Sequence, residues 1–144
     1  MIKAFAATAT TCEVAPGTQQ SGPDGIVHVR NQTFTDIVRS NDQRVAGINK
    51  PVLDLDFNPA DGTGTVRGPF TLQLEKAGGA WEGHMTGEIR KGLVTAKGLA
   101  RGRGSLEGSI MRVDFRQVEK LEGDAPCANP TAFFEMEGSI LDLD

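Results

Sequence analysis

Two charged residues near the end of a long apolar segment, Arg112 and Asp114, are the first candidates for chemistry. They stand two positions apart in "SIMRVDF", so in a β-strand they point to the same side. A guanidinium group can hold the oxyanion or carboxylate of a substrate while a neighbouring carboxylate transfers a proton. The structural alternative is a mutual ion pair, because charges are seldom buried without a partner.

The orientation of this pair depends on the residues before it. The two apolar residues and the glycine of "LEGSI" precede Arg112 and Asp114 at the same parity. An unbroken strand therefore places both charges on the face of that glycine. A β-bulge between Ile110 and Met111 would reverse the assignment, because the apolar residues of "MRVDF" form an equally good inner face.

Other familiar site patterns are missing from the sequence. His28, His84, Cys12 and Cys127 have no spacing that suggests a local pair of metal ligands, so no metal site is expected. The chain has no G-x-S-x-G element for a nucleophilic serine and no phosphate-binding glycine loop followed by lysine and a hydroxyl residue. We therefore expect no cofactor.

Two further polar pairs have ordinary structural interpretations beside their chemical ones. Glu82 and His84 share one face of a strand and could act as an acid–base pair, but their parity is opposite to that of the neighbouring glycines, which predicts an outer position. Asp42 and Arg44 stand at the entrance to a strand, where an aspartate that caps the turn and pairs with the arginine is the structural expectation.

The elements that position all these residues are strands. The chain has 144 residues, enough for one domain over 1–144, and its 18 glycines and lack of long helical patterns favour short strands and turns. The expected strands are Ile2–Thr11, Gly25–Asn31, Thr33–Arg39, Arg44–Phe57, Gly64–Glu75, Ala80–Arg90, Leu93–Ala100 and Ser105–Val118, with Thr131–Leu143 as a closing segment. A continuous early pair would leave eight strands.

A repeated frame of apolar, polar, glycine, any residue and apolar favours a barrel over an open sandwich. It occurs in "WEGHM", "LEGSI" and "MEGSI", and without the acid in "VRGPF". Glycines between apolar neighbours on one strand face let a sheet coil tightly. We predict an all-β, antiparallel up-and-down barrel of about eight strands, with Gly68, Gly83, Gly108 and Gly138 facing its interior.

Four large side chains fall on the glycine-bearing face and are the expected ligand-binding residues: Phe70, Trp81, Met85 and Phe134. In a barrel of this size the same residues can form either a filled core or the wall of a pocket. Arg112 and Asp114 near one end of such a pocket would be its catalytic groups.

Charge and cysteine content limit the partners. A net charge of −4 argues against nucleic acid, and the basic segment 90–104 has no interleaved aromatic residues. No apolar run is long enough for a membrane helix, and the N-terminus has no signal-peptide pattern, so no membrane partner is expected. Cys12 and Cys127 are then expected to be reduced thiols in a cytoplasmic protein, with a disulfide across the closed barrel as the alternative.

Several motifs in the middle of the chain resemble a known family. "NDQRVAG", "DGTGTVRGPFTL", "GGAWEGHMTGEI" and "GRGSLEGSI" are similar to segments of bacterial allene oxide cyclase-like barrel proteins, a superfamily that includes dirigent proteins and spirotetronate cyclases. The resemblance implies a barrel with an apolar lumen that guides or cyclises hydrophobic molecules and often assembles into homo-oligomers. It carries no catalytic residue over to this chain.

The sequence thus predicts a barrel that binds a small hydrophobic molecule, with a cofactor-independent cyclase or isomerase as the enzymatic form of this function. The alternatives are a non-catalytic carrier of the same shape and a structural protein whose filled barrel forms oligomers. The presence of an apolar cavity with one or two polar groups separates the first two from the third.

Overall fold

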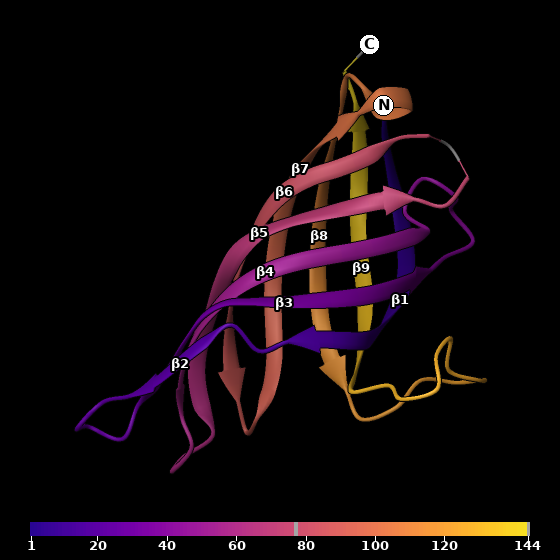
Figure 1. The fold of residues 1–144 in the computed structure, drawn as a ribbon. Coiled ribbons are helices and arrows are strands. Elements are labelled where there is room, and N and C mark those ends of the chain that lie inside the picture. Colours follow the sequence, from indigo (N-terminus) through magenta and orange to yellow (C-terminus); the bar gives the residue numbers. More distant parts are fainter. Residues whose placement is uncertain (77, 144) are drawn as a thin grey trace.

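The computed structural model describes residues 1–76 and 78–143, which form an all-β barrel (Figure 1). Its strands are β1 (Ile2–Ala15), β2 (Thr18–Ser21), β3 (Val27–Arg39), β4 (Gly47–Asn58), β5 (Thr63–Leu74), β6 (Ala80–Arg90), β7 (Leu93–Arg103), β8 (Ser109–Val118) and β9 (Ala132–Asp142). The helical element among the described residues is a single 3-10 turn, η1 (Gly104–Leu106). No helix in this part of the chain is long and apolar enough to cross a bilayer.

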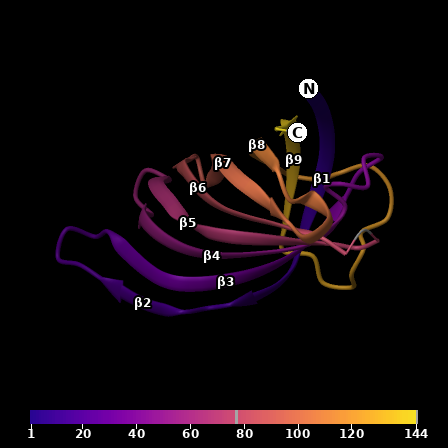
Figure 2. The same ribbon diagram turned by 90° about the horizontal axis from the view of Figure 1, so that it is seen from above.

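The strands form an antiparallel meander that closes on itself. From β3 to β9 each strand pairs with the next along the chain, and β1 pairs with β9 on one edge and β3 on the other. The short β2 continues beyond the end of β1 along β3, so eight strands form the closed barrel and β2 extends it as a hairpin (Figure 2). The predicted up-and-down barrel of about eight strands is confirmed.

The early part of the chain differs from the expected strand list. The segments Gly25–Asn31 and Thr33–Arg39 are continuous, as in the alternative with eight strands: from Val27 on they form one strand, β3, whose register against β4 shifts between Val29 and Gln32. Asn31 lies within this shift and has a φ of 56°, a left-handed conformation that asparagine tolerates better than most residues. The polar sequence "TQQS" forms β2 with all four residues exposed, so it lacks the alternation that marks a half-buried strand.

The glycine-bearing faces of β5, β6 and β9 point into the barrel as expected. Gly68 is buried between buried apolar residues of β5, and Gly83 shares its parity with the buried residues of β6. Gly138 shows why a side chain is excluded there: a Cβ atom would lie 2.7 and 2.9 Å from ring carbons of Phe5. The aromatic ring of β1 therefore covers the bare backbone of β9 and packs in the core.

The alternation is interrupted before β8, and the prediction for Gly108 is wrong. The chain forms the 3-10 turn η1, and Gly108 follows it with a φ of 89°, so this glycine belongs to a turn and not to an inward strand face. β8 begins at Ser109 with the opposite parity, and Met111, Val113 and Phe115 are its buried residues. The irregular segment thus lies a few residues earlier than the bulge considered from the sequence.

One end of the barrel is packed solid with apolar side chains. Four fully buried residues lie at this end. Leu72 and Ile140 are near the ends of β5 and β9, and Trp81 and Met111 are near the starts of β6 and β8. Leu106 of the 3-10 turn joins the same cluster. The core therefore lies toward this end, and any space for a guest must lie toward the other.

Candidate functional site

A cavity of about 200 Å³ occupies the other half of the barrel. Val94, Gln117 and Ala132 line it, and they lie at the start of β7, the end of β8 and the start of β9. Its wall is mainly apolar and includes Phe34, Leu53, Leu55, Val66, Met85, Phe115 and Phe134. The barrel is therefore filled at one end and hollow at the other.

The structure divides the four expected ligand-binding residues into two pairs. Met85 and Phe134 line the cavity. Trp81 is fully buried at the packed end, where its Nε1 donates a hydrogen bond of 2.6 Å to the carbonyl oxygen of Arg44. Phe70 is buried behind the cavity wall and meets the ring of Phe115 edge to face, with 6.0 Å between centroids. Trp81 and Phe70 thus belong to the core.

Arg112 and Asp114 do not reach the cavity, and the expectation that they lie inside or at one end of the lumen is wrong. Both side chains are exposed on the outer face of β8. Their neighbours across the sheet include the exposed Leu99 and Lys97 of β7. The physical reason is the irregular turn before Ser109, which reverses the parity of every later residue in the strand.

The fully buried polar groups of the cavity come from β1, β3 and β4, and the half-buried Gln32 and Gln117 also line it. Asp36 of β3 stands between Thr11 of β1 and Asn49 of β4 in the register of the sheet, and all three side chains are buried and line the cavity. The Thr11 hydroxyl donates a 2.7 Å hydrogen bond to Asp36 Oδ1. The Asn49 side chain also hydrogen-bonds Asp36. We call these three residues the polar corner.

Burial controls the acidity of the polar corner. Asp36 is 7 % exposed, and its burial raises its pKa to about 6 although hydrogen bonds from Thr11 and Asn49 favour the charged form. A carboxyl group that titrates near neutral pH inside an apolar cavity is suited to hold or transfer a proton. No motif marks Asp36, but its parity in "TFTDIVR" was available: it alternates with Phe34 and Val38 on the inner face.

The raised pKa predicts a specific pH dependence of stability. An aspartate in an unfolded chain titrates at about pH 4. Between this pH and about pH 6 the folded state therefore binds more protons than the unfolded state. The contribution of Asp36 to the free energy of unfolding must then fall as the pH rises through this window. Relative to Asp36→Asn, wild type should lose about 2 kcal/mol between pH 4 and pH 7, measured by urea unfolding.

The comparison with Asp36→Asn isolates this group, because every other carboxylate is shared by the two proteins. One of these is Asp56, whose pKa is held well below its usual range by hydrogen bonds from His28, Arg30 and Arg67. Unfolding free energies that run parallel across the pH range in the two proteins would contradict the prediction.

The two further polar pairs have the structural arrangements that were expected for them, one on the outer face of a strand and the other in a turn. Glu82 and His84 are exposed on β6, and Glu82 pairs with Arg103 of β7 at 3.1 Å. Asp42 accepts a 3.0 Å hydrogen bond from the backbone N–H of Arg44 and pairs with its guanidinium group at 3.1 Å. Both structural interpretations are therefore confirmed.

A charged cluster that no sequence motif predicted lies on the outer faces of β3, β4 and β5. Asp56 lies 2.6 Å from His28 Nδ1, 2.9 Å from Arg30 and 3.1 Å from Arg67. Two partners come from β3 and one from β5, on either side of the strand that carries Asp56, and they meet only through the sheet register. The cluster connects the base of the β2–β3 hairpin to the barrel.

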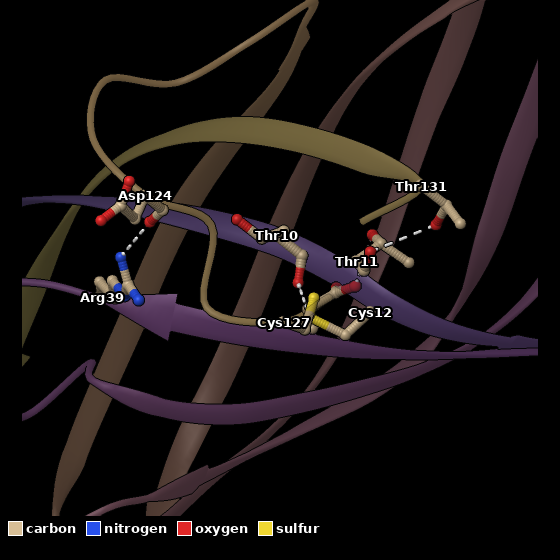
Figure 3. The surroundings of a disulfide bond; sticks show 8 residues. Thr10, Thr11, Cys12, Arg39, Asp124, Cys127 and Thr131 are labelled. Atoms are coloured by element: carbon tan, nitrogen blue, oxygen red, sulfur yellow. Dashed lines mark hydrogen bonds between the residues drawn. A yellow bond between two sulfur atoms is a disulfide. The ribbon is translucent and has the colours of Figure 1, made fainter. Parts of the chain in front are cut away.

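Cys12 and Cys127 form a disulfide, so the expectation of two free thiols is wrong (Figure 3). Cys12 lies at the register shift of β1, directly after Thr11, and Cys127 lies in the β8–β9 loop. Two hydrogen bonds hold the same loop. The Arg39 guanidinium group donates to the carbonyl oxygen of Asp124 at 2.9 Å, and the backbone N–H of Thr131 donates to the carbonyl oxygen of Thr11 at 2.9 Å. The loop is therefore fixed to the strand that carries one member of the polar corner.

The disulfide also removes the argument for a cytoplasmic location. That prediction depended on reduced thiols, whereas disulfides persist mainly in oxidising compartments. Cytoplasmic location stays a prediction without this support.

Comparisons with protein-family models, with curated proteins and with solved structures each found no match to this chain. Among the described residues, no group of three or more histidine, cysteine, aspartate or glutamate side chains is placed to hold a metal ion. The barrel, its cavity and the polar corner are thus the basis for any functional conclusion.

Proposed function

We propose that this protein binds a compact, largely apolar small molecule in the hollow half of its barrel. The observation that supports this most directly is the cavity of about 200 Å³, whose apolar wall is interrupted by a polar corner. An apolar cavity with a few converging polar groups is the usual form of a small-molecule site. A structural barrel needs no such space, because filling it with side chains would increase its stability.

The size of the cavity limits the guest. Benzene occupies an engineered protein cavity of roughly 150 Å³, so this one suits a guest of about ten non-hydrogen atoms. Met85, Phe115 and Phe134 would contact such a guest from three strands, and Asp36 would contact its polar end. Burial of the guest against these side chains would supply most of the binding free energy.

The resemblance of the sequence to allene oxide cyclase-like barrels agrees with this proposal, since that family guides or cyclises hydrophobic molecules. Membership of the family, and the homo-oligomer that the resemblance implies, are part of the proposal.

A cofactor-independent cyclase or isomerase is the second candidate, and the pKa of Asp36 favours it. A buried carboxyl group with a pKa of about 6 can act as a general acid or base near neutral pH. It would take the role first assigned to Arg112 and Asp114. If a guest were recovered as a rearranged product that Asp36→Asn does not form, the enzyme would be favoured over the carrier.

Filling the cavity should abolish binding without harming the fold. Ala9 is buried on the inner face of β1 and lines the cavity, so Ala9→Leu would place an isobutyl group in the space of the guest. We expect indane, a bicyclic hydrocarbon, to bind wild type and to bind Ala9→Leu at least about tenfold more weakly, as measured by titration calorimetry. The melting temperature of the free variant should stay the same or rise.

Ala6→Leu is the matched control. Ala6 lies on the same strand but is exposed on the outer face, so this variant should bind indane like wild type. A wild-type protein that binds no compact hydrocarbon, or an Ala9→Leu variant that binds as tightly as wild type, would refute binding in the barrel cavity.

A further inference from the structure

The polar corner has an unbalanced set of hydrogen-bonding groups. The Thr11 hydroxyl proton is already donated to Asp36, and the Asn49 side chain is hydrogen-bonded to the same carboxylate. Asn49 Oδ1 is buried and has no hydrogen-bond partner in the described part of the chain. Asn49 itself is 2 % exposed. The unsatisfied oxygen that the corner offers to a guest is therefore an acceptor, beside the lone pairs of the Asp36 carboxylate, and the second amide N–H of Asn49 is its remaining donor.

An acceptor left without a donor in a buried site is costly. A buried polar atom without a partner loses its hydrogen bonds to water and gains none in return, which destabilises the protein. A guest that brings an N–H or O–H group to this corner recovers part of that loss. A guest that brings only acceptors leaves Asn49 Oδ1 without a partner.

The charge of the cavity wall also disfavours guests that bring acceptors, and above all guests with a negative charge. Asp36 is the one ionisable residue among the residues that line the cavity, and no lysine, arginine or histidine lines it. A carboxylate guest would face the acceptor groups of the polar corner without a cation to neutralise it. Repulsion between like charges is strong where water is excluded.

We propose that the cavity selects guests by a neutral hydrogen-bond donor, of which a hydroxyl group is the simplest, and rejects guests with a carboxylate. Thr11, Asp36 and Asn49 form the recognition site, and the apolar wall holds the rest of the molecule. This inference rests on the proposed function, because it names the chemical class of the same guest.

A series of matched compounds tests the selectivity. Indane, indanol, methoxyindane and indane carboxylate, the last three substituted at the same ring carbon, share one apolar body and differ in donor, acceptor and charge. We expect indanol to bind wild type about tenfold more tightly than methoxyindane, because only indanol can donate a hydrogen bond to a charged or otherwise unsatisfied acceptor of the polar corner. Indane carboxylate should bind most weakly of the four in calorimetry at neutral pH.

The outcomes separate the two proposals. If none of the four compounds binds, the proposed function fails. If indane binds but methoxyindane or the carboxylate equals indanol, the cavity is a binding site and the donor selectivity is overturned. A water molecule that satisfies Asn49 permanently would produce this second result.

Two variants assign the selectivity to the polar corner. Asp36→Asn replaces an acceptor and its charge with an amide that can donate, so the ratio of indanol to carboxylate affinity should fall at least about tenfold. Asn49→Leu, close in shape, removes the unsatisfied oxygen and should reduce the preference for indanol over methoxyindane. Asp114→Asn is the control, because it makes the same change on the exposed outer face.

Circular dichroism and the affinity for indane show whether each variant keeps its fold and its cavity. A folded Asp36→Asn protein with the selectivity of wild type would overturn the role of the polar corner. If neither variant folds, the wild-type series alone decides the proposal.

Discussion

Replacing Trp81 with alanine is expected to lower the free energy of unfolding by about 3–5 kcal/mol, a large part of the stability of a domain of this size. The indole is 0 % exposed and belongs to the buried core at the packed end of the barrel. Truncation removes this apolar contact area and leaves the carbonyl oxygen of Arg44 without its 2.6 Å hydrogen bond. Urea unfolding followed by circular dichroism measures the loss. Tryptophan fluorescence does not serve, because Trp81 is the one tryptophan of the chain and the variant lacks it.

Trp81→Phe is the matched control. It keeps most of the apolar volume and removes the indole N–H, so its cost should lie well below that of Trp81→Ala. If Trp81→Ala lowers the free energy of unfolding by less than about 1 kcal/mol, the packed end is not packed as described, and the assignment of Trp81 to the core is wrong.

Reducing the disulfide, or replacing both cysteines with serine, is expected to lower the free energy of unfolding by about 2–5 kcal/mol. Cys12 and Cys127 are separated by 115 positions, so the bond strongly restricts the unfolded chain. It also holds the β8–β9 loop against β1. Urea unfolding with and without a thiol reductant measures the effect.

The Cys12→Ser, Cys127→Ser double variant provides the internal control, because its stability should not respond to the reductant. Thiol titration of unfolded wild type should find no free thiol before reduction and two after it. Unfolding curves of wild type that coincide with and without reductant would show that the disulfide does not contribute to stability.

The regular strands could be predicted from the sequence because their alternation is uninterrupted. In β5 and β6 the inward positions of Gly68 and Gly83 were predicted correctly, and the glycine frame predicted a closed and strongly curved sheet. The same parity argument failed at Arg112 and Asp114, because a 3-10 turn and a left-handed glycine precede β8. Local sequence does not reveal how many residues such a turn takes out of the alternation.

The candidate site was harder to predict because its members come from different strands. Thr11, Asp36 and Asn49 are far apart in the chain and meet through the registers of β1, β3 and β4. Asp36 could have been identified as an acid on the inner face of a predicted strand. The disulfide depends on the closure of the barrel and the path of the β8–β9 loop, and neither follows from the spacing of the two cysteines.

The way the barrel closes also constrains the order in which it can form. β1 pairs along Ile2–Thr11 with residues of β9, the last of the described strands, so this seam cannot begin to form on the ribosome until the segment after residue 131 has been synthesised. Until then β1 has only β3 as a partner, and one of its edges stays open to other chains. Contacts this distant in sequence are slow to form. Because the disulfide joins Cys12 to a residue just before β9, it brings the two edges of the seam together and makes the last pairing a local event.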